Sequence, residues 1–379
     1  MKKILFIIIF LLITINIKAT EIDLSKNSKS SILIEQSTGK ILYEKNKDEK
    51  RSPASMTKIM TLLLTFEALE KEIITYDTPV QVSKNAQDMG GTQIFLEYGS
   101  TVDVLTLIKG ITIASANDAA VAIAEKLGGT KENFVQMMND KAINLGCKNT
   151  NFKNPHGLDE EGHYTTAYDL SLIAKELLKY EEVLKFTSTY EDYINVSGEN
   201  HWLVNTNKLV RFYEGIDGLK TGFTENAKYC LTATMKKNDM RLISVVMGVD
   251  TKENRNAETI SLMEYGYSHY GISNIYNKED TIGKTIIENA KNKEVKYYFE
   301  KDVNLIAKKG EREIDYQIDT KIYDIKAPLK ENSVIGETII SYNNQNFKYN
   351  LINHENIEKE NFLDVIYSII KNIISGSEI

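Results

Sequence analysis

Short apolar runs separated by turn-forming residues predict two β-hairpins in the N-terminal two thirds of the chain. The first covers residues 31–44 and turns at Ser37-Thr38-Gly39, three residues that favour a tight turn. The second joins the β-rich runs 228–236 and 241–249 through Lys237-Asn238-Asp239. Each hairpin would contribute one pair of antiparallel strands.

Longer apolar stretches in the same region predict helices. Residues 55–70 predict a largely buried helix, and Pro53 lies near its start, where a missing N–H group costs little. Two more helices are expected over residues 102–113 and 118–127, separated by Ala114-Ser115-Ala116-Asn117. Both helices and strands are therefore expected in this part of the chain.

After residue 272 the pattern changes. Tyr, Lys, Asn, Glu and Ile dominate, runs such as 295–299 alternate weakly, and turn residues recur roughly every 8–12 positions. This pattern predicts a small all-β domain over residues 273–355. We therefore expect a first domain with helices and strands over residues 20–272, followed by this β-rich domain.

The first 19 residues have the pattern of a secretory signal peptide. Two lysines precede an apolar run from Ile4 to Ile17, and the small residue Ala19 lies at the expected cleavage site. An uncleaved membrane anchor is the alternative, but the run is shorter than the roughly 20 residues that span a bilayer. The mature protein is therefore expected to begin near Thr20 and to be exported.

The last segment, residues 356–379, predicts an amphipathic helix, because at 100° per residue its apolar side chains fill one continuous arc. The apolar arc contains Phe362, Leu363, Val365, Ile366, Tyr367, Ile369, Ile370, Ile373 and Ile374, and the polar remainder contains Asp364, Ser368, Lys371 and Asn372. Such a helix is too short and too polar to span a bilayer, but it suits the membrane interface. We expect a peripheral membrane anchor. The alternative is a helix that docks on the β-rich domain or on a dimer partner.

Composition narrows the class of protein. The 379 residues carry 46 Lys and Arg against 53 Asp and Glu, and the resulting net charge of −7 disfavours nucleic acid as a partner. Hydrophobic residues make up 42% of the chain, as in a globular protein with a full core. Cys147 and Cys230 cannot form a disulfide framework, nor a metal-ligand motif with the five scattered histidines. We therefore expect no metal and no other cofactor, and we expect both cysteines to be buried.

Three short motifs carry the candidate chemistry. Ser55-Met56-Thr57-Lys58 is a Ser-x-x-Lys motif at the start of a predicted helix. Ser115-Ala116-Asn117 is a Ser-x-Asn motif between two helices, and Lys220-Thr221-Gly222 is a Lys-Thr-Gly motif on a predicted strand. Each motif alone arises by chance. In this order they form the set found in penicillin-binding proteins and class A β-lactamases.

The spacing of the first motif indicates a serine nucleophile with a lysine base. Residues three positions apart share a helix face, so Lys58 is expected beside Ser55. A lysine can accept the serine proton only when it is neutral, whereas free lysine has a pKa of roughly 10.4. Burial of Lys58 and the neighbouring charge of Lys220 are expected to lower that pKa.

The other motif residues would assist the reaction. Ser115 is expected to relay a proton to the leaving group, and Asn117 to hold the substrate amide and the Lys58 side chain. The backbone N–H groups of Ser55 and Phe223 are expected to form an oxyanion hole.

The residues around these motifs resemble the serine-type D-alanyl-D-alanine carboxypeptidases, which are low-molecular-mass penicillin-binding proteins with a β-lactamase/transpeptidase-like fold. The matching segments are 52–58, 114–119, 154–158 and 218–224. The resemblance implies an α/β (α+β) catalytic domain in which helices flank an antiparallel sheet. It also implies removal of the terminal D-alanine from peptidoglycan stem pentapeptides through an acyl-enzyme on Ser55.

The same resemblance implies roles for individual residues. The catalytic set would be Ser55, Lys58, Ser115, Asn117 and Lys220, and the substrate-binding set Lys220, Thr221, Gly222, Phe223 and Arg255. Arg255 follows Lys220 at the spacing of an arginine that helps to hold the substrate carboxylate, although a simple ion pair with Glu253 is the alternative. Phe223 stands where some relatives have histidine. His156 is expected to be structural, and Trp202 to be a packing or subsite residue.

Related activities stay open from the sequence. A D,D-endopeptidase uses the same chemistry, and a β-lactamase-like hydrolase is disfavoured because the Leu-Asn dipeptide of the class A Glu-x-x-Leu-Asn loop is absent. A non-catalytic penicillin sensor is disfavoured by the intact Ser55, Lys58 and Lys220. The expected partners are peptidoglycan stem peptides, β-lactam antibiotics and the membrane surface. The expected location is the outer face of the cytoplasmic membrane, at the cell wall.

Overall fold

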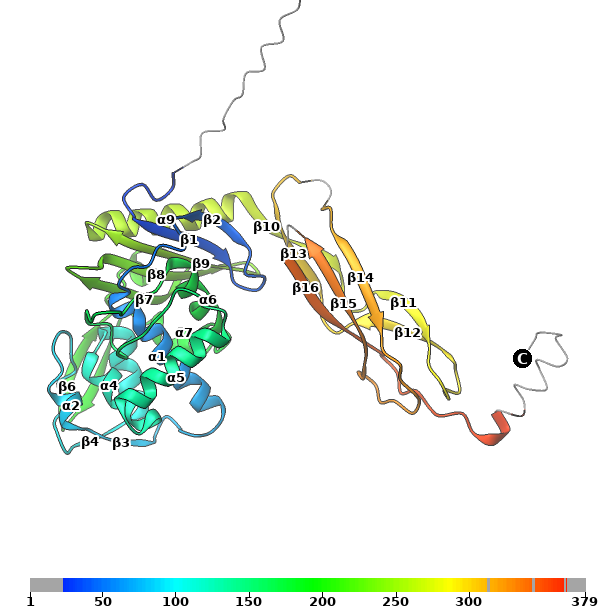
Figure 1. Ribbon diagram of the computed structural model, residues 1–379, viewed down its shortest axis with the longest axis horizontal. Helices are drawn as coiled ribbons and strands as arrows, with labels where there is room; N and C mark the ends of the chain where they lie inside the picture. The colour runs from blue at the N-terminus through cyan, green and yellow to red at the C-terminus, as the bar shows by residue number, and fades with distance from the viewer. Residues whose placement is uncertain (1–22, 312–313, 343–344, 365, 367–379) are drawn as a thin grey trace, which may run out of the picture.

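The computed structural model describes residues 23–311, 314–342, 345–364 and 366. A mixed α/β domain is followed by an elongated β-rich region that extends away from one end of it (Figure 1). The expected signal peptide and most of the expected C-terminal helix lie outside the described residues, so both stay predictions. Within the described ranges, no helix combines the length and apolar composition that crossing a membrane requires.

An antiparallel five-stranded sheet forms the centre of the α/β domain, in the order β2-β1-β9-β8-β7. The strands are β1 (Ser30–Glu35), β2 (Ile41–Lys45), β7 (Ile216–Thr224), β8 (Lys228–Lys237) and β9 (Met240–Val249). Both predicted hairpins are confirmed as β1-β2 and β8-β9. Every residue of β9 is buried, because this central strand is covered on both faces.

Side chains of the sheet alternate between two helical layers. On β1, Ile32 and Ile34 belong to one hydrophobic core, whereas Leu33 belongs to a second core on the opposite face. This alternation follows from the two-residue period of a strand. The first core includes residues of α1 (Lys58–Glu70) and α6 (Ala167–Leu177), and the second includes residues of α9 (Lys252–His269) (Figure 1).

The rest of the α/β domain lies outside the five-stranded sheet. It contains α2 (Lys84–Gln87), α3 (Val104–Lys109), a π-helical turn (Gly110–Ala114), α4 (Asn117–Gly128), α5 (Lys131–Asn144), α7 (Val183–Thr187), α8 (Leu209–Phe212) and the ribbons β3 (Pro79–Gln81) with β4 (Thr101–Asp103) and β5 (Glu191–Val196) with β6 (Glu199–Val204).

Two predicted helices start differently in the structure. The helix expected over residues 55–70 is confirmed, but its first turn, Ala54–Thr57, is a 3₁₀ turn. The helix expected over residues 102–113 is wrong at its start, because residues 101–103 pair with β3 as a strand. Asp103 then caps α3 by accepting a hydrogen bond from the Thr106 N–H group (2.6 Å).

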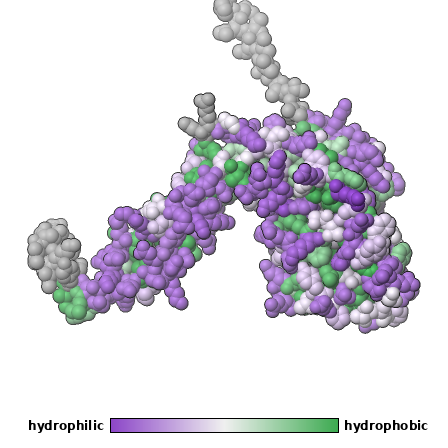
Figure 2. Space-filling view, turned by 180° about the vertical axis from the view of Figure 1, so that it is seen from behind, coloured by the Kyte–Doolittle hydropathy of each residue, from purple (hydrophilic) through white to green (hydrophobic). Residues whose placement is uncertain are grey.

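The C-terminal region is all-β, as the sequence predicts. Strand β10 pairs with β13, and a second sheet has the order β11-β12-β16-β15-β14. The strands are β10 (Tyr270–Tyr276), β11 (Thr281–Ile286), β12 (Glu294–Phe299), β13 (Val303–Lys308), β14 (Gln317–Ile322), β15 (Val334–Tyr342) and β16 (Gln345–Ile352). This region has its own core around Phe299, Leu305 and Leu351, and hydrophilic residues cover most of its visible surface (Figure 2).

Contacts from β10, β13 and the first hairpin join the two regions. Lys40, beside the β1-β2 turn, donates a hydrogen bond from Nζ to the Ile306 carbonyl oxygen (2.5 Å). Lys309 donates from Nζ to the Tyr267 carbonyl oxygen on α9 (2.7 Å).

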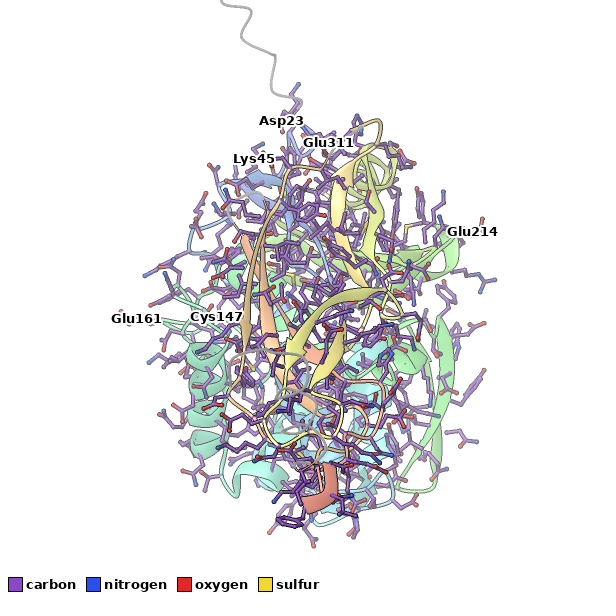
Figure 3. All side chains as sticks on the ribbon, turned by 90° about the vertical axis from the view of Figure 1, so that its right-hand side faces the viewer. Asp23, Lys45, Cys147, Glu161, Glu214 and Glu311 are labelled. Carbon is purple, nitrogen blue, oxygen red and sulfur yellow. The ribbon has the colours of Figure 1, made fainter. Side chains whose placement is uncertain are left out.

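At the end of the molecule shown uppermost in Figure 3, Lys45 forms an ion pair with Asp23, the first described residue (3.3 Å).

Candidate active site

Ser55 and Lys58 lie next to each other at the start of α1. Ser55 belongs to the 3₁₀ turn, and Lys58 is the first residue of the helix. The Lys58 Nζ atom lies 3.1 Å from Ser55 Oγ, as the spacing of three positions predicts. Lys58 is fully buried, whereas Ser55 is partly exposed. The hydroxyl can therefore meet a ligand while the amine is shielded from solvent.

Two further contacts of Lys58 orient its amine. Nζ lies 2.6 Å from Asn117 Oδ1 and 2.7 Å from the His156 carbonyl oxygen. Both oxygens can only accept, so two N–H groups of the amine point toward them. The third contact is with the Ser55 hydroxyl, which can donate. When Lys58 is neutral, its two N–H groups can satisfy both oxygens and its lone pair can face the serine proton.

The Ser-x-Asn motif is held in an unusual backbone conformation. Ser115 has a φ of 67°, in the left-handed region, and follows the π-helical turn directly. Non-glycine residues adopt this conformation rarely, and it often marks functional sites. In the part of the chain that the structure describes, the Ser115 hydroxyl forms no hydrogen bond. The side chain is thus free to act on a bound ligand.

Asn117 is fixed by the loop that precedes the motif. Its Nδ2 group donates to the Gly90 carbonyl oxygen (2.7 Å), which directs Oδ1 toward Lys58. The neighbouring Asp118 carboxylate holds the same loop by accepting from the N–H groups of Ile94 (3.0 Å) and Leu96 (3.1 Å). Asp118 was not singled out from the sequence, although its adjacency to the Ser-x-Asn motif was the available signal.

The Lys-Thr-Gly motif lies on β7, the edge strand of the sheet, which packs against the 3₁₀ turn that carries Ser55. A Cβ atom on Gly222 would lie 2.9 Å from the Pro53 carbonyl oxygen and 3.2 Å from the Ala54 Cβ atom. Glycine is therefore required for this close approach. Lys220 is almost fully buried, and its Nζ donates to the Thr221 carbonyl oxygen (3.2 Å).

Burial and neighbouring charge lower the pKa of both lysines. Burial is the main cause for Lys58, whose pKa is well below its ordinary value, and the positive charge of Lys220 lowers it further. The pKa of Lys220 falls to about 7, first through burial and then through the charge of Arg255. These causes are the ones that the sequence predicts for Lys58. The site therefore favours the neutral form of Lys58 more strongly than water does.

The expected carboxylate-binding residues lie around the same strand. The Thr221 hydroxyl donates to Thr206 Oγ1 (2.7 Å), at the end of the β5-β6 hairpin. Arg255 is buried on the first turn of α9 and donates from Nε and Nη2 to Asn256 Oδ1 (3.1 and 2.8 Å). Among the described residues Arg255 forms no ion pair, so the alternative pairing with Glu253 is not observed.

Gly157 is a residue of the site that sequence analysis missed. Its φ is 90°, and a Cβ atom on it would lie only 1.9 Å from the Ala54 carbonyl oxygen. The loop can therefore pass directly behind Ser55, which brings the His156 carbonyl oxygen to Lys58. The segment 154–158 was recognised in the sequence, but only as part of the resemblance.

Other sequence predictions concern residues outside the reacting groups. The His156 ring accepts a hydrogen bond from the Leu158 N–H group (3.2 Å), and burial lowers its pKa to about 3, which agrees with a structural role. Cys147 and Cys230 are buried and free, as expected. Trp202 is 59% exposed on β6, which disfavours the packing alternative and leaves the subsite alternative as a prediction.

The site has a serine hydroxyl beside a buried lysine whose pKa is lowered, and it lies among helices and an antiparallel sheet. This combination is typical of serine peptidases that use a lysine as the base. The chain belongs to the D-alanyl-D-alanine carboxypeptidase family: residues 16–251 match the family model of that description. Residues 270–359 match a second model, that of the C-terminal domain of penicillin-binding protein 5.

Relatives cover most of the chain. D-alanyl-D-alanine carboxypeptidase DacF of Bacillus subtilis is 48% identical over 320 residues, which is 84% of this chain and 82% of that protein. D-alanyl-D-alanine carboxypeptidase DacA of Escherichia coli is 31% identical over 363 residues, with 91% of this chain and 87% of that protein covered.

Solved structures have the same two-part architecture. The peptidoglycan synthesis regulatory factor PBP3 of Streptococcus pneumoniae superposes with a TM-score of 0.77 at 29% identity, covering 88% of this chain and 99% of that one. Penicillin-binding protein 5 of Haemophilus influenzae gives a TM-score of 0.72 at 29% identity, covering 88% and 98% of the two chains.

Proposed function

We propose that the protein is a D,D-carboxypeptidase that removes the terminal D-alanine from peptidoglycan stem pentapeptides through an acyl-enzyme on Ser55. The observation that carries this proposal is the set of three contacts around Lys58 Nζ, to Ser55 Oγ, Asn117 Oδ1 and the His156 carbonyl oxygen. This arrangement fits a general base that is already neutral and aimed at the nucleophile.

In the first half-reaction, Lys58 accepts the Ser55 proton while Oγ attacks the carbonyl carbon of the penultimate D-alanine. The negative charge on the carbonyl oxygen is stabilised by the backbone N–H groups of Ser55 and Phe223. The C–N bond then breaks, and Ser115 passes a proton to the departing amine, so that D-alanine leaves neutral at nitrogen. The proton on Lys58 replaces the one that Ser115 gives up.

In the second half-reaction, water attacks the ester carbon of the acyl-enzyme. Lys58, neutral again, accepts a proton from this water and passes it to the Ser55 oxygen as the ester bond breaks. The shortened peptide is released and the starting state is restored. No metal or other cofactor takes part in either half-reaction.

Recognition of the free C-terminus distinguishes a carboxypeptidase from a peptidase that cuts inside a chain. We assign the terminal carboxylate to Thr221 and Arg255, with Lys220 adding positive charge and Gly222 and Phe223 supplying the strand backbone. A buried guanidinium suits this task because its planar fork matches a carboxylate. Support comes from the proximity of Arg255 to Lys220, whose pKa it lowers.

A single assay tests this function. The protein is incubated with a pentapeptide ending in D-Ala-D-Ala and with its C-terminal amide, and the products are followed by mass spectrometry. We expect loss of one D-alanine from the free acid, and we expect Arg255→Ala to reduce that turnover at least ten-fold more than turnover of the amide. Release of a longer fragment would indicate an endopeptidase, and equal losses on both substrates would make Arg255 structural.

We further propose the domain limits 20–272 and 273–355, export by a signal peptide over residues 1–19, and a peripheral anchor over residues 356–379. Strand β10 begins at Tyr270, so the first limit falls inside a strand that belongs to both parts. Phe362 and Leu363, the first two residues of the apolar arc of the expected anchor, are 77% and 73% exposed. Their exposure favours an anchor over a helix docked on the β-rich domain at this point.

A further inference from the structure

A buried series of hydrogen bonds lies behind Ser55 and has no part in the mechanism described so far. The Lys153 N–H group donates to His163 Nδ1 (3.0 Å). His163 Nε2 lies 2.8 Å from Thr57 Oγ1, and the Thr57 hydroxyl donates to the Ala54 carbonyl oxygen (2.8 Å). His163 is 5% exposed and Thr57 is fully buried. Solvent therefore cannot replace either partner.

The direction of each hydrogen bond in this series follows from the two ends. The backbone N–H group of Lys153 can only donate, so His163 Nδ1 must carry a lone pair. The proton of the neutral ring is then on Nε2, which donates to Thr57 Oγ1. Thr57 accepts this bond and keeps its own proton for the Ala54 carbonyl oxygen. Burial lowers the pKa of His163 to about 4, which agrees with the neutral ring that this pattern requires.

The Ala54 carbonyl group matters because it shares a peptide plane with the Ser55 N–H group. The peptide is trans, so the C=O and N–H bonds point in opposite directions, and a fixed carbonyl also fixes the N–H direction. Ala54 has a φ of 47°, a left-handed conformation that is unfavourable for a residue with a side chain. The surrounding contacts must hold this peptide, and Thr57 and the close approach of Gly157 both act on its oxygen.

We propose that His163 is a positioning residue that acts through Thr57 and the Ala54 carbonyl group to aim the Ser55 N–H group at the developing oxyanion. This inference rests on the proposed function, in which that N–H group is one of two oxyanion donors. Removing one such donor from a serine hydrolase costs about 10²–10³ in rate, so misdirecting it should cost somewhat less. The loss should fall on the chemical step and leave substrate binding unchanged, because the charge exists only in the transition state.

Two matched substitutions test the hydrogen bonds of His163 Nδ1 and His163 Nε2 separately. In His163→Gln, the side-chain amide can still donate to Thr57, from the position of Nε2. In His163→Asn, the shorter amide can accept from the Lys153 N–H group but cannot reach Thr57. The experiment measures the acylation rate constant with benzylpenicillin, kcat and KM with the pentapeptide, and the melting temperature of each protein.

We expect His163→Asn to lower kcat and the acylation rate constant by about ten-fold or more, with KM within about two-fold of the original value. His163→Gln should recover most of this loss. Thr57→Val should cause the same loss, and adding His163→Asn to it should cause no further loss, since both act through one carbonyl group. Thr57→Ser keeps the hydroxyl and should remain active.

Several results would overturn the proposal. Equal rates for His163→Asn and His163→Gln, additive losses in the double variant, or a rise in KM at constant kcat would each show that His163 does not direct the oxyanion donor. If both His163 variants fail to fold, the comparison of Thr57→Val with Thr57→Ser decides in their place, and equal rates there would reject the proposal. A wild-type protein that benzylpenicillin does not acylate would instead reject the proposed function itself.

Discussion

Lys58 and Lys220 are buried a short distance apart, and the fold gives neither of them an acidic partner at hydrogen-bonding distance among the described residues. Such an arrangement costs stability, because an ammonium group loses its hydration on burial. It also favours the neutral amine that the proposed base requires, because the cost is reduced when the amine loses its proton. The chemistry of the site is therefore obtained at the expense of folding free energy.

The pH dependence of stability tests this cost at Lys220. Its pKa is about 7 in the folded protein against an ordinary value of 10.5, so between these values the unfolded chain binds more protons. Stability should therefore rise with pH above about 7, and Lys220→Met should remove the part of this rise that Lys220 contributes, leave the part due to Lys58, and add about 4 kcal/mol at pH 7. Urea unfolding of both proteins at pH 7 and pH 9 checks this. An identical pH dependence in the two would contradict a depressed pKa for Lys220.

Some residues of the site could be predicted from the sequence and others could not. The pairing of Ser55 with Lys58 follows from helical spacing, and the lowered pKa of Lys58 follows from the need for a neutral base. His163 and Thr57 could not be found in this way, because their contacts depend on how residues over a hundred positions apart are brought together. The sequence around a single histidine does not show which groups the folded protein brings into contact with it.

At the scale of elements, three of the segments that form the site pack directly against one another at Ser55. The 3₁₀ turn packs against β7 at Gly222 and against the loop at Gly157. The sequence predicts the hairpins and the helix over residues 55–70, because these depend on local periodicity. It does not predict the 3₁₀ turn or strand β4, because both depend on packing and capping that periodicity does not record.

Gly157 provides the test at this scale. Gly157→Ala places a Cβ atom 1.9 Å from the Ala54 carbonyl oxygen at a φ of 90°, so either the loop or the Ser55 turn must move. We expect a loss of about 2–4 kcal/mol in stability and at least a ten-fold slower acylation by benzylpenicillin.

Gly146→Ala is the matched control. Its φ of 82° is equally unfavourable for alanine, but the new Cβ atom meets nothing within 4 Å. It should cost about 1 kcal/mol and leave acylation nearly unchanged. Equal effects of the two substitutions would mean that backbone conformation alone, and not the contact with Ala54, accounts for the change.

At the scale of the whole molecule, the α/β domain carries the reacting groups, while the β-rich region extends from α9 and leads to the expected anchor (Figure 1). The change in sequence pattern after residue 272 predicts the division into two regions. It does not predict that Lys40 and Lys309 join them, because both contacts are to backbone carbonyl oxygens that have no sequence signature.

The expected anchor predicts how the whole protein distributes between liposomes and solution. The mature full-length chain should float with neutral liposomes, because its binding depends on buried apolar side chains, while a chain ending at Glu358 should stay in solution and keep its activity. Ile369→Ser combined with Ile373→Ser should release the full-length chain, whereas Lys371→Ser should not. If the full-length and shortened chains distribute alike, the C-terminal segment packs on protein and the anchor is rejected.

The central claim is that Ser55 is the nucleophile, activated by Lys58, and intact-mass spectrometry after exposure to benzylpenicillin tests it most directly. Relative to the untreated protein, the mass of the wild-type protein should rise by that of one drug molecule. The control is Ser52→Ala, which removes a neighbouring serine whose hydroxyl donates to Asp159 Oδ1 (2.8 Å), and its mass should rise in the same way. In Ser55→Ala no adduct should form, and turnover of the pentapeptide should fall by several orders of magnitude, about 10⁴-fold or more. An adduct that persists in Ser55→Ala would contradict the account.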